Sequence, residues 1–172
     1  MNQLIGSATA FSSGGPGKGM HCRAVTNLMQ KHNFVDGASG INSHFTDSGL
    51  FGMTIEGPGS HSAELMSLLC QELNALKDPI DEVELNRAKN ILKMNVLMAM
   101  ERSDDRLEEV ARNFMTYGDL TCHQYCEKID MVTSSQINAM ATKPLSGKPT
   151  LLVTGGAINL VPPKPQNPKT PF

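Results

Sequence analysis

The hydrophobic periodicity of the chain changes once along its length, and this change limits the folds that the chain can adopt. Between residues 33 and 56, two short runs alternate polar and apolar residues, which is typical of β-strands. From residue 60 to about residue 145, apolar residues recur every three or four positions, which indicates amphipathic helices. A hairpin followed by a series of helices predicts an α+β fold, in which helices pack on one face of an antiparallel sheet.

Turn and capping residues set the expected bounds of these elements. Strands are predicted over residues 33–45 and 50–56, with a turn at 47–49 between them. Helices are predicted over residues 19–31, 60–77 (with Ser60 as the N-cap), 81–100 and 103–118, and two short helices follow Thr121 and Thr133. Gln124 and Gln136 complete capping boxes with these two threonines, and Asp81 with Glu84 gives a similar pattern.

The end of the chain contains one further apolar run. Residues 149–154 (PTLLVT) predict a buried strand, and the proline-rich residues 162–172 predict an extended tail. We therefore divide the chain into a domain at 1–161 and a tail at 162–172. Three strands are few for this many helices, and unpaired sheet edges are unfavourable. Further strands are therefore expected to come from another segment or another chain.

Composition narrows the class of protein. The formal net charge of −2 provides no positive field, so no nucleic-acid partner is expected. No apolar run reaches the roughly 18–20 residues that a membrane span needs. The four cysteines are scattered without a preceding secretory signal, which favours a reducing compartment. No basic transit peptide is visible at the first residues.

The segment from Ser13 to Gly19 (SGGPGKG) invites comparison with a phosphate-binding loop. Such a loop needs a glycine where this chain has Ser12 and a serine or threonine where it has Gly19, and no strand is predicted before the segment. Nucleotide binding is therefore disfavoured. Two interpretations stay open: a flexible loop that leads into a helix, or a mobile loop whose backbone closely approaches an extended peptide, which glycine permits.

Two other patterns resemble metal sites but lack ligands. Residues 61–65 (HSAEL) differ from the inverted zinc-peptidase motif H-x-x-E-H at the last position, so the second histidine is missing and His61 is interpreted as a surface residue. Cys122 and Cys126 lie one helical turn apart beside His123, without a further ligand pair nearby. We interpret these cysteines as free and buried, and no metal or other cofactor is expected in this chain.

Several segments together resemble one protein family. Residues 11–20 (FSSGGPGKGM) closely resemble the glycine-rich loop of mitochondrial processing peptidase alpha subunits. Residues 47–52 (DSGLFG) are similar to the hairpin that follows this loop in the family, and residues 84–93 (ELNRAKNILK) are similar to the start of its long helix. The similarity covers about residues 1–161 and includes the later segments 112–118 and 128–133.

The resemblance implies a fold and a function. The chain corresponds to most of the carboxyl-terminal, pitrilysin-like α+β domain of an alpha subunit, without its first strands. Such a subunit is not catalytic and captures mitochondrial presequences for a beta subunit that carries H-x-x-E-H and zinc. The resemblance assigns presequence binding to the loop residues Ser13, Gly14, Gly15, Pro16, Gly17, Lys18 and Gly19. His21 and Cys22 replace the aromatic residue and serine usual in the family, which leaves substrate preference open.

The same family includes the core subunits of respiratory complex III, so a second function stays open. In that role the chain would be a matrix-facing scaffold of ubiquinol–cytochrome c reductase, with cytochrome b and cytochrome c1 as partners, and some lineages combine both roles. Either role implies a beta-type subunit as a partner, and a separate amino-terminal half is a further expected partner. Either role also places the chain in the mitochondrial matrix or on the matrix side of the inner membrane.

Overall fold

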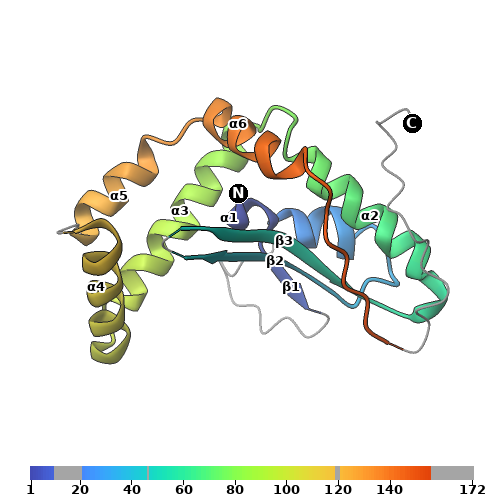
Figure 1. The fold of residues 1–172 in the computed structure, drawn as a ribbon, viewed down its shortest axis with the longest axis horizontal. Coiled ribbons are helices and arrows are strands. Elements are labelled where there is room, and N and C mark those ends of the chain that lie inside the picture. Colours follow the sequence, from blue (N-terminus) through green and yellow to red (C-terminus); the bar gives the residue numbers. More distant parts are fainter. Residues whose placement is uncertain (10–20, 46, 119–120, 156–172) are drawn as a thin grey trace.

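A three-stranded antiparallel sheet lies at the centre of the computed structural model (Figure 1). The structure describes residues 1–9, 21–45, 47–118 and 121–155. The strands are β1 (Ser7–Thr9), β2 (Gly37–His44) and β3 (Gly49–Glu56), in the order β1-β2-β3. Both β1 and β3 are therefore edge strands of this sheet.

Helices complete the predicted α+β architecture. They are α1 (Asn2–Ile5), the π-helix η1 (Ala24–Met29), the 3₁₀-helix η2 (Gly59–His61), α2 (Ser62–Ala75), α3 (Glu82–Ala99), α4 (Ser103–Tyr117), α5 (Cys122–Asp130) and α6 (Ser134–Leu145). The helices α4 and α5 lie at the opposite end of the molecule from α2 (Figure 1). Within the described ranges, no helix is both long and apolar enough to cross a membrane.

The register of the sheet separates apolar from polar side chains. Ala38 pairs with Ala8 on one side and with Ile55 on the other, and this row faces the helices. In the next row Ser39 pairs with Thr54, and their hydroxyl oxygens are joined by a hydrogen bond of 2.7 Å. Because successive side chains point to opposite faces of a strand, only one face of the sheet contributes to the core.

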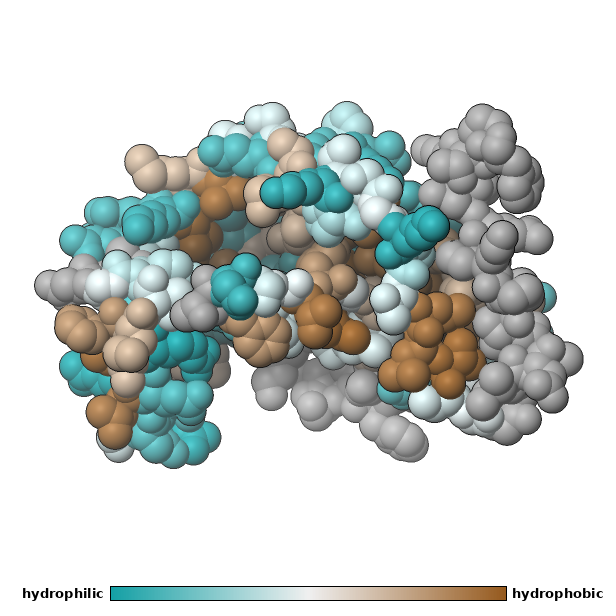
Figure 2. All heavy atoms as spheres, in the orientation of Figure 1, coloured by the Kyte–Doolittle hydropathy of each residue, from teal (hydrophilic) through white to brown (hydrophobic). Residues whose placement is uncertain are grey.

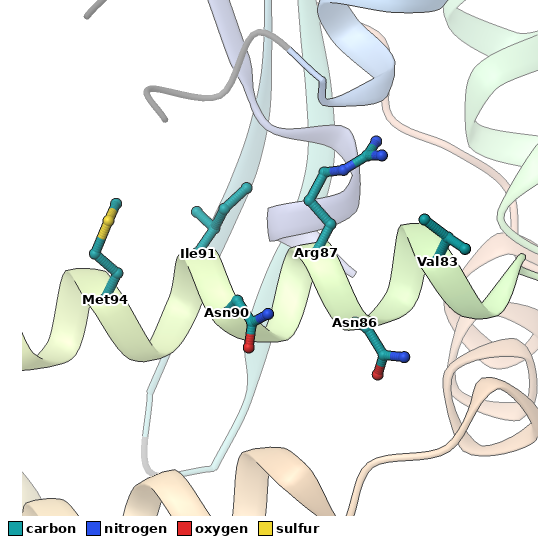
Figure 3. A pocket seen from close by; sticks show the side chains of 6 residues that line it. All are labelled: Val83, Asn86, Arg87, Asn90, Ile91 and Met94. Carbon is teal, nitrogen blue, oxygen red and sulfur yellow. The ribbon is translucent and has the colours of Figure 1, made fainter. Parts of the chain in front are cut away.

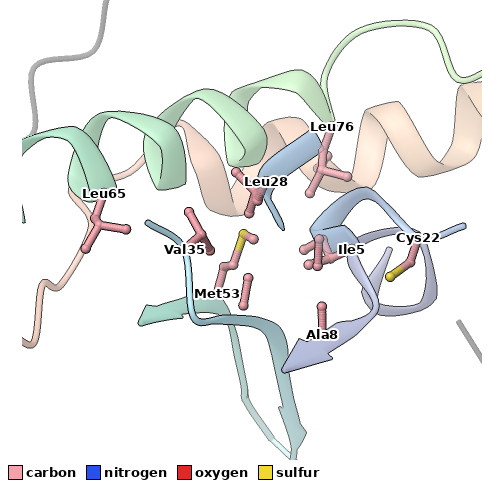
Figure 4. Packing of buried hydrophobic residues seen from close by; sticks show 11 residues of the cluster. Ile5, Ala8, Cys22, Leu28, Val35, Met53, Leu65 and Leu76 are labelled. Atoms are coloured by element: carbon pink, nitrogen blue, oxygen red, sulfur yellow. The ribbon is translucent and has the colours of Figure 1, made fainter. Parts of the chain in front are cut away.

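The main hydrophobic core lies between α2, η1 and the sheet (Figure 4). Leu28 of η1 and Leu76, which follows α2, are only 1% and 0% exposed. Met53 of β3 and Ile5 of α1 are also buried there. Burying each large apolar side chain contributes about 1.5–3 kcal/mol before the entropic cost. This core therefore fixes one end of the β2–β3 hairpin against α2.

A second, smaller core fixes α3 to neighbouring helices. Leu4 of α1 packs with Leu85 of α3 and Ile137 of α6. On the surface beside it, Lys93 Nζ of α3 lies 2.8 Å from Asp130 Oδ1 of α5. These contacts hold one face of α3 in place and leave its opposite face uncovered by them.

Three predicted boundaries differ from the structure. The helix predicted over 19–31 is described only as the shorter η1, in which the N–H of Gln30 donates to the carbonyl of Val25 at 2.9 Å, the spacing of a π-helix. The strand β1 lies before the glycine-rich segment, where no strand is predicted, because three residues carry too little alternation to be recognised. Helix α2 begins after His61 rather than after Ser60, since the η2 turn comes between them.

The strand predicted over residues 149–154 is wrong. These residues have no strand assignment in the structure, and Leu151 and Leu152 are 40% and 85% exposed. A strand is stabilised by hydrogen bonds to a neighbouring strand, and no described strand pairs with this segment. The proline-rich tail at 162–172 lies outside the described residues.

Candidate functional site at the glycine-rich segment

The predicted presequence-binding residues, Ser13 to Gly19, lie outside the residues that the structure describes. The chain is described on both sides of this segment, up to Thr9 and again from His21. The described part of the site therefore consists of these two flanks and of a groove whose wall includes the second flank.

The first flank is fixed to the sheet through β1. The N–H of Gly40 in β2 donates to the carbonyl of Gly6 at 2.9 Å, immediately before β1 begins. Gly6 has a φ of 73°, a conformation that favours glycine. A Cβ at this position would overlap the side chain of Cys22. The absence of a side chain at Gly6 therefore lets the two flanks of the segment touch.

The second flank enters the main core directly. Cys22, Ala24 and Leu28 are all buried, at exposures of 6%, 0% and 1%. The hydroxyl of Thr26 donates to the carbonyl of Cys22 at 3.1 Å, within the first turn of this flank. Since Cys22 also lies against Gly6, the two flanks meet at the same part of the core.

Arg23 joins the second flank to α3. Its Nε and Nη2 donate to the two carboxylate oxygens of Glu84 at 2.6 Å and 2.9 Å, and its Nη1 donates to the carbonyl of Ala75 at 3.1 Å. The Glu84 hydrogen bonds raise the pKa of Arg23, and burial opposes this effect. The side chains of Arg23 and Glu84 are only 12% and 25% exposed, so the bidentate pair is shielded from solvent.

An open groove of about 470 Å³ surrounds this ion pair. Its wall combines the second flank, the connection between α2 and α3, and the first turns of α3. The titratable side chains that line it are His21, Arg23, Asp78, Asp81, Glu84 and Arg87. Carboxylates in such a groove can pair with cationic side chains of a peptide, whereas the arginines can receive its backbone carbonyls.

The ion pair explains why one predicted capping box does not form. Asp81 is the N-cap of α3, but its side chain makes no capping hydrogen bond. Glu84, expected to complete the box, binds Arg23 instead, because the bidentate pair gives its carboxylate two hydrogen bonds from a cation, whereas the box would give it one from a backbone N–H. The other two boxes, at Thr121 and Thr133, are confirmed.

The two patterns that resemble metal sites make other contacts. His61 Nδ1 lies 2.9 Å from Glu64 Oε2, and its ring stacks on Phe34 with the ring centroids 4.6 Å apart. Cys122 and Cys126 are free thiols, but they are half-buried rather than buried as predicted. Across the described part of the chain, no group of three or more His, Cys, Asp or Glu residues could hold a metal ion.

The sequence does not reveal the role of Arg23 and Glu84. The two residues are 61 positions apart, so no local spacing relates them. From its neighbours alone, Glu84 is predicted to complete a capping box and Arg23 to lie on the surface of a helix. Only the packing of η1 beside the start of α3 brings the two side chains together.

Comparison with known proteins identifies related sequences. A family model described as the peptidase M16 inactive domain matches residues 1–92, a range that includes both flanks and Glu84. The mitochondrial-processing peptidase subunit alpha of Caenorhabditis elegans is 33% identical over 156 residues, which cover 90% of this chain and 30% of that protein. The probable alpha subunit of Schizosaccharomyces pombe is 36% identical over 166 residues, which cover 88% of this chain and 33% of that protein.

A solved structure supports the fold. A chain of the Inz-5-bound complex III2 from Candida albicans superposes with a TM-score of 0.67 at 19% identity, covering 83% of this chain and 34% of that chain. At this identity the likeness concerns the fold alone. The chain spans about a third of the length of each of these relatives.

Proposed function

The chain belongs to the family of the peptidase M16 inactive domain, and we propose that it is the carboxyl-terminal part of a non-catalytic, alpha-type subunit of a mitochondrial processing peptidase. In this role it binds presequences through the residues Ser13 to Gly19 and presents them to a beta-type subunit. The observation that carries the proposal is the match to relatives named as alpha subunits, which extends over 88–90% of the chain.

The geometry of the flanks supports a peptide-handling role for the segment. Gly6 and Cys22, which flank the segment on either side, lie next to each other at the core, so the described residues give the segment a fixed base. Loops on a rigid scaffold commonly carry binding residues, and glycines allow a peptide backbone to approach closely. A rigid base reduces the conformational entropy that is lost when a peptide binds.

The groove at the second flank supports a preference for cationic peptides. Presequences are basic amphipathic helices, and the exposed carboxylates of Asp78 and Asp81 lie on the groove wall near the second flank, whereas Glu84 is already paired with Arg23. Exposed ion pairs contribute only about 0–1 kcal/mol each, so the groove adds selectivity rather than most of the affinity. Arg87 on the same wall would repel cations at that end and so fix the direction of the peptide.

Cleavage is assigned to the partner in this proposal. The beta-type subunit supplies the zinc and the H-x-x-E-H motif, while this chain supplies no cofactor. The relatives that support the assignment are mitochondrial by name, so the proposed location is the mitochondrial matrix or the matrix side of the inner membrane.

A second candidate function is a scaffold role in respiratory complex III. The observation that favours it is the fold similarity to a chain of complex III2, at a TM-score of 0.67. Native isolation from mitochondria followed by mass spectrometry separates the two functions. Co-purification of cytochrome b and cytochrome c1 would support the complex III role, and a beta-type chain without the cytochromes would support the processing peptidase.

Deletion of residues 14–19 tests the peptide-handling role. In a peptidase reconstituted with a beta-type subunit, we expect kcat/KM for a presequence peptide to fall at least about tenfold, because lost positioning raises the barrier to cleavage. Assembly, measured by size-exclusion chromatography, should persist because both flanks are anchored independently. An unchanged cleavage rate would contradict the proposal.

The substitution Asp81→Asn tests the groove within the same assay. Its side chain makes no capping hydrogen bond, so we expect KM for an arginine-containing peptide to rise about threefold while kcat stays constant. Asp47→Asn is the matched control, because it removes an exposed carboxylate at the hairpin turn. Equal effects of the two substitutions would show that only net charge matters.

A further inference from the structure

Helix α4 exposes its apolar face and buries a polar residue. Leu107, Val110 and Phe114 recur at helical spacing and are 73%, 53% and 65% exposed. The only residue of α4 that is buried is Asn113, at 8% exposure. Brown side chains lie beside teal ones over α4 at the lower left of Figure 2. Because amphipathic helices normally turn the apolar stripe toward their core, this stripe is directed at something other than the described chain.

Helix α3 has apolar residues on two faces, and only one face is covered. Leu85 and Ala88 are buried in the second core. On another face a groove of about 500 Å³ runs along the helix, and Val83, Arg87, Ile91 and Met94 lie on its wall (Figure 3). Val83 is 62% exposed and Met94 is 39% exposed. Asn86, Arg87 and Asn90 share this wall with the apolar side chains, and such a mixture of apolar and polar groups is typical of protein–protein interfaces.

The apolar residues continue to the end of α3, where Leu97 and Met98 are each 55% exposed. We call the combined set the α3–α4 apolar surface; it comprises Val83, Ile91, Met94, Leu97, Met98, Leu107, Val110 and Phe114. Exposed apolar patches larger than a few hundred Å² are uncommon on monomers and mark interaction sites.

Several charges on and next to α4 are paired with one another. Arg112 contacts Glu108 at 2.8 Å and Glu109 at 3.4 Å, and Arg102 contacts Asp104 at 3.0 Å. An apolar centre with self-neutralised charges at its edge resembles the anatomy of a protein–protein interface. It does not resemble a surface that attracts a strongly charged ligand.

We propose that the α3–α4 apolar surface is the docking site for the polypeptide that corresponds to the amino-terminal part of the alpha-subunit relatives. This chain spans only 30% and 33% of two such relatives, so about two thirds of their length has no counterpart here. The inference rests on the alpha-subunit assignment and is independent of presequence binding. It holds whether that polypeptide is joined to this chain or is separate.

The sheet favours the same occupant. Among the described residues, no strand pairs with the outer edge of β1 or β3, and Phe45 and Leu50 near the hairpin tip are 60% and 64% exposed. A large polypeptide with strands of its own can pair with an open edge and cover the helices in one interface. A small ligand would cover neither the edge nor both helices.

The test combines this 172-residue chain with the amino-terminal two thirds of the S. pombe relative, produced as a separate tagged polypeptide. Binding is measured by biolayer interferometry, with hydrogen exchange to locate the contact. We expect binding, together with slower amide exchange in α4 and the second half of α3. Unchanged exchange in these helices on binding would overturn the proposal, and so would an absence of binding.

Phe114→Asp is the diagnostic substitution, and it should weaken binding about 30-fold or more, as for a central interface anchor. Thr116→Asp is the matched control, because it adds the same charge on the opposite side of α4 and should leave binding unchanged. Equal binding by both variants would overturn the proposal. Exchange protection in the unsubstituted chain gives an answer even if Phe114→Asp impairs folding.

Two further outcomes separate the alternatives. If the isolated chain forms a dimer that Phe114→Asp disrupts, and the amino-terminal polypeptide does not compete with it, then the occupant is a second copy and the proposal is wrong. Deletion of residues 14–19 should leave this binding unchanged while it impairs presequence cleavage, so failure of docking and failure of the proposed function are distinguishable.

Discussion

The two ends of the β2–β3 hairpin have the same backbone pairing but very different surroundings. At the first end, Ala38 and Met53 are 3% and 8% exposed beneath α2 and η1. At the tip, Ile41, Phe45 and Leu50 are 41%, 60% and 64% exposed. The β2–β3 pairing therefore extends along the whole hairpin, but side-chain packing is complete over only part of it.

This difference shows which contacts the chain supplies for itself. The elements α1, η1 and α2 reach the first end of the hairpin and close the main core there. The helix α4, at the far end of the molecule (Figure 1), presents Leu107 and Phe114 outward instead of closing a core of its own. We infer that the first end governs the stability of this chain, whereas the far end governs its association with other polypeptide.

The largest expected difference is in the free energy of unfolding lost on substitution by alanine, between Leu76 and Leu107. Leu76→Ala should lower the free energy of unfolding by about 2–5 kcal/mol, because Leu76 is 0% exposed and its removal leaves a cavity. Leu107→Ala should change it by less than about 0.5 kcal/mol, because Leu107 is 73% exposed. Urea denaturation followed by circular dichroism measures both values in the isolated chain. Similar losses for both variants would break the comparison.

Gly6→Ala should cause the next largest loss of stability. Its φ of 73° and the contact with Cys22 leave no room for a methyl group, so we expect a loss of about 1–3 kcal/mol in unfolding free energy. Gly52→Ala in β3 is the control, because a Cβ there meets nothing within 4 Å and should not destabilise. Urea denaturation measures the unfolding free energy of both variants. A neutral Gly6→Ala would show that the flanks of the glycine-rich segment are not held together as described.

The smallest expected effect is a pH dependence from two thiols, one on α2 and one on α5. Burial is the main cause that raises the pKa of Cys70 and of Cys122 above the ordinary value of 9.0. A raised pKa in the folded state favours the neutral thiol, so the stability contribution is complete below pH 9 and is lost as the pH rises through the folded pKa. Alkylation rates measured by mass spectrometry should therefore have midpoints above pH 9.0 in the folded chain. Midpoints that do not shift on unfolding in urea would contradict this.

Much of the fold follows from local patterns in the sequence. The capping residues Thr121 and Thr133 start α5 and α6 where predicted, because each box satisfies backbone donors within one helical turn. The hairpin is also confirmed, since alternation and a turn at residues 47–49 specify it locally. The family could also be assigned from the sequence, because the motif of the glycine-rich segment is specific.

Long-range contacts account for what the sequence did not reveal. Glu84 occupies a capping position but binds Arg23, and nothing in either neighbourhood predicts that pair. Residues 149–154 have the composition of a strand but form none here, because strand formation requires a partner that composition does not provide. Both errors come from interactions between residues far apart in the chain.

The sequence by itself determined the α+β class, the positions of the hairpin and the helices, and the membership of a family of inactive peptidase domains. These features depend on periodicity, capping and motif, which are properties of neighbouring residues. The tertiary structure decided that Gly6 and Cys22 bring together the flanks of the glycine-rich segment and that Leu107 and Phe114 face away from the core. It alone could do so, because burial depends on which surfaces meet in three dimensions, and the apolar stripe of α4 would read the same in sequence whether covered or exposed.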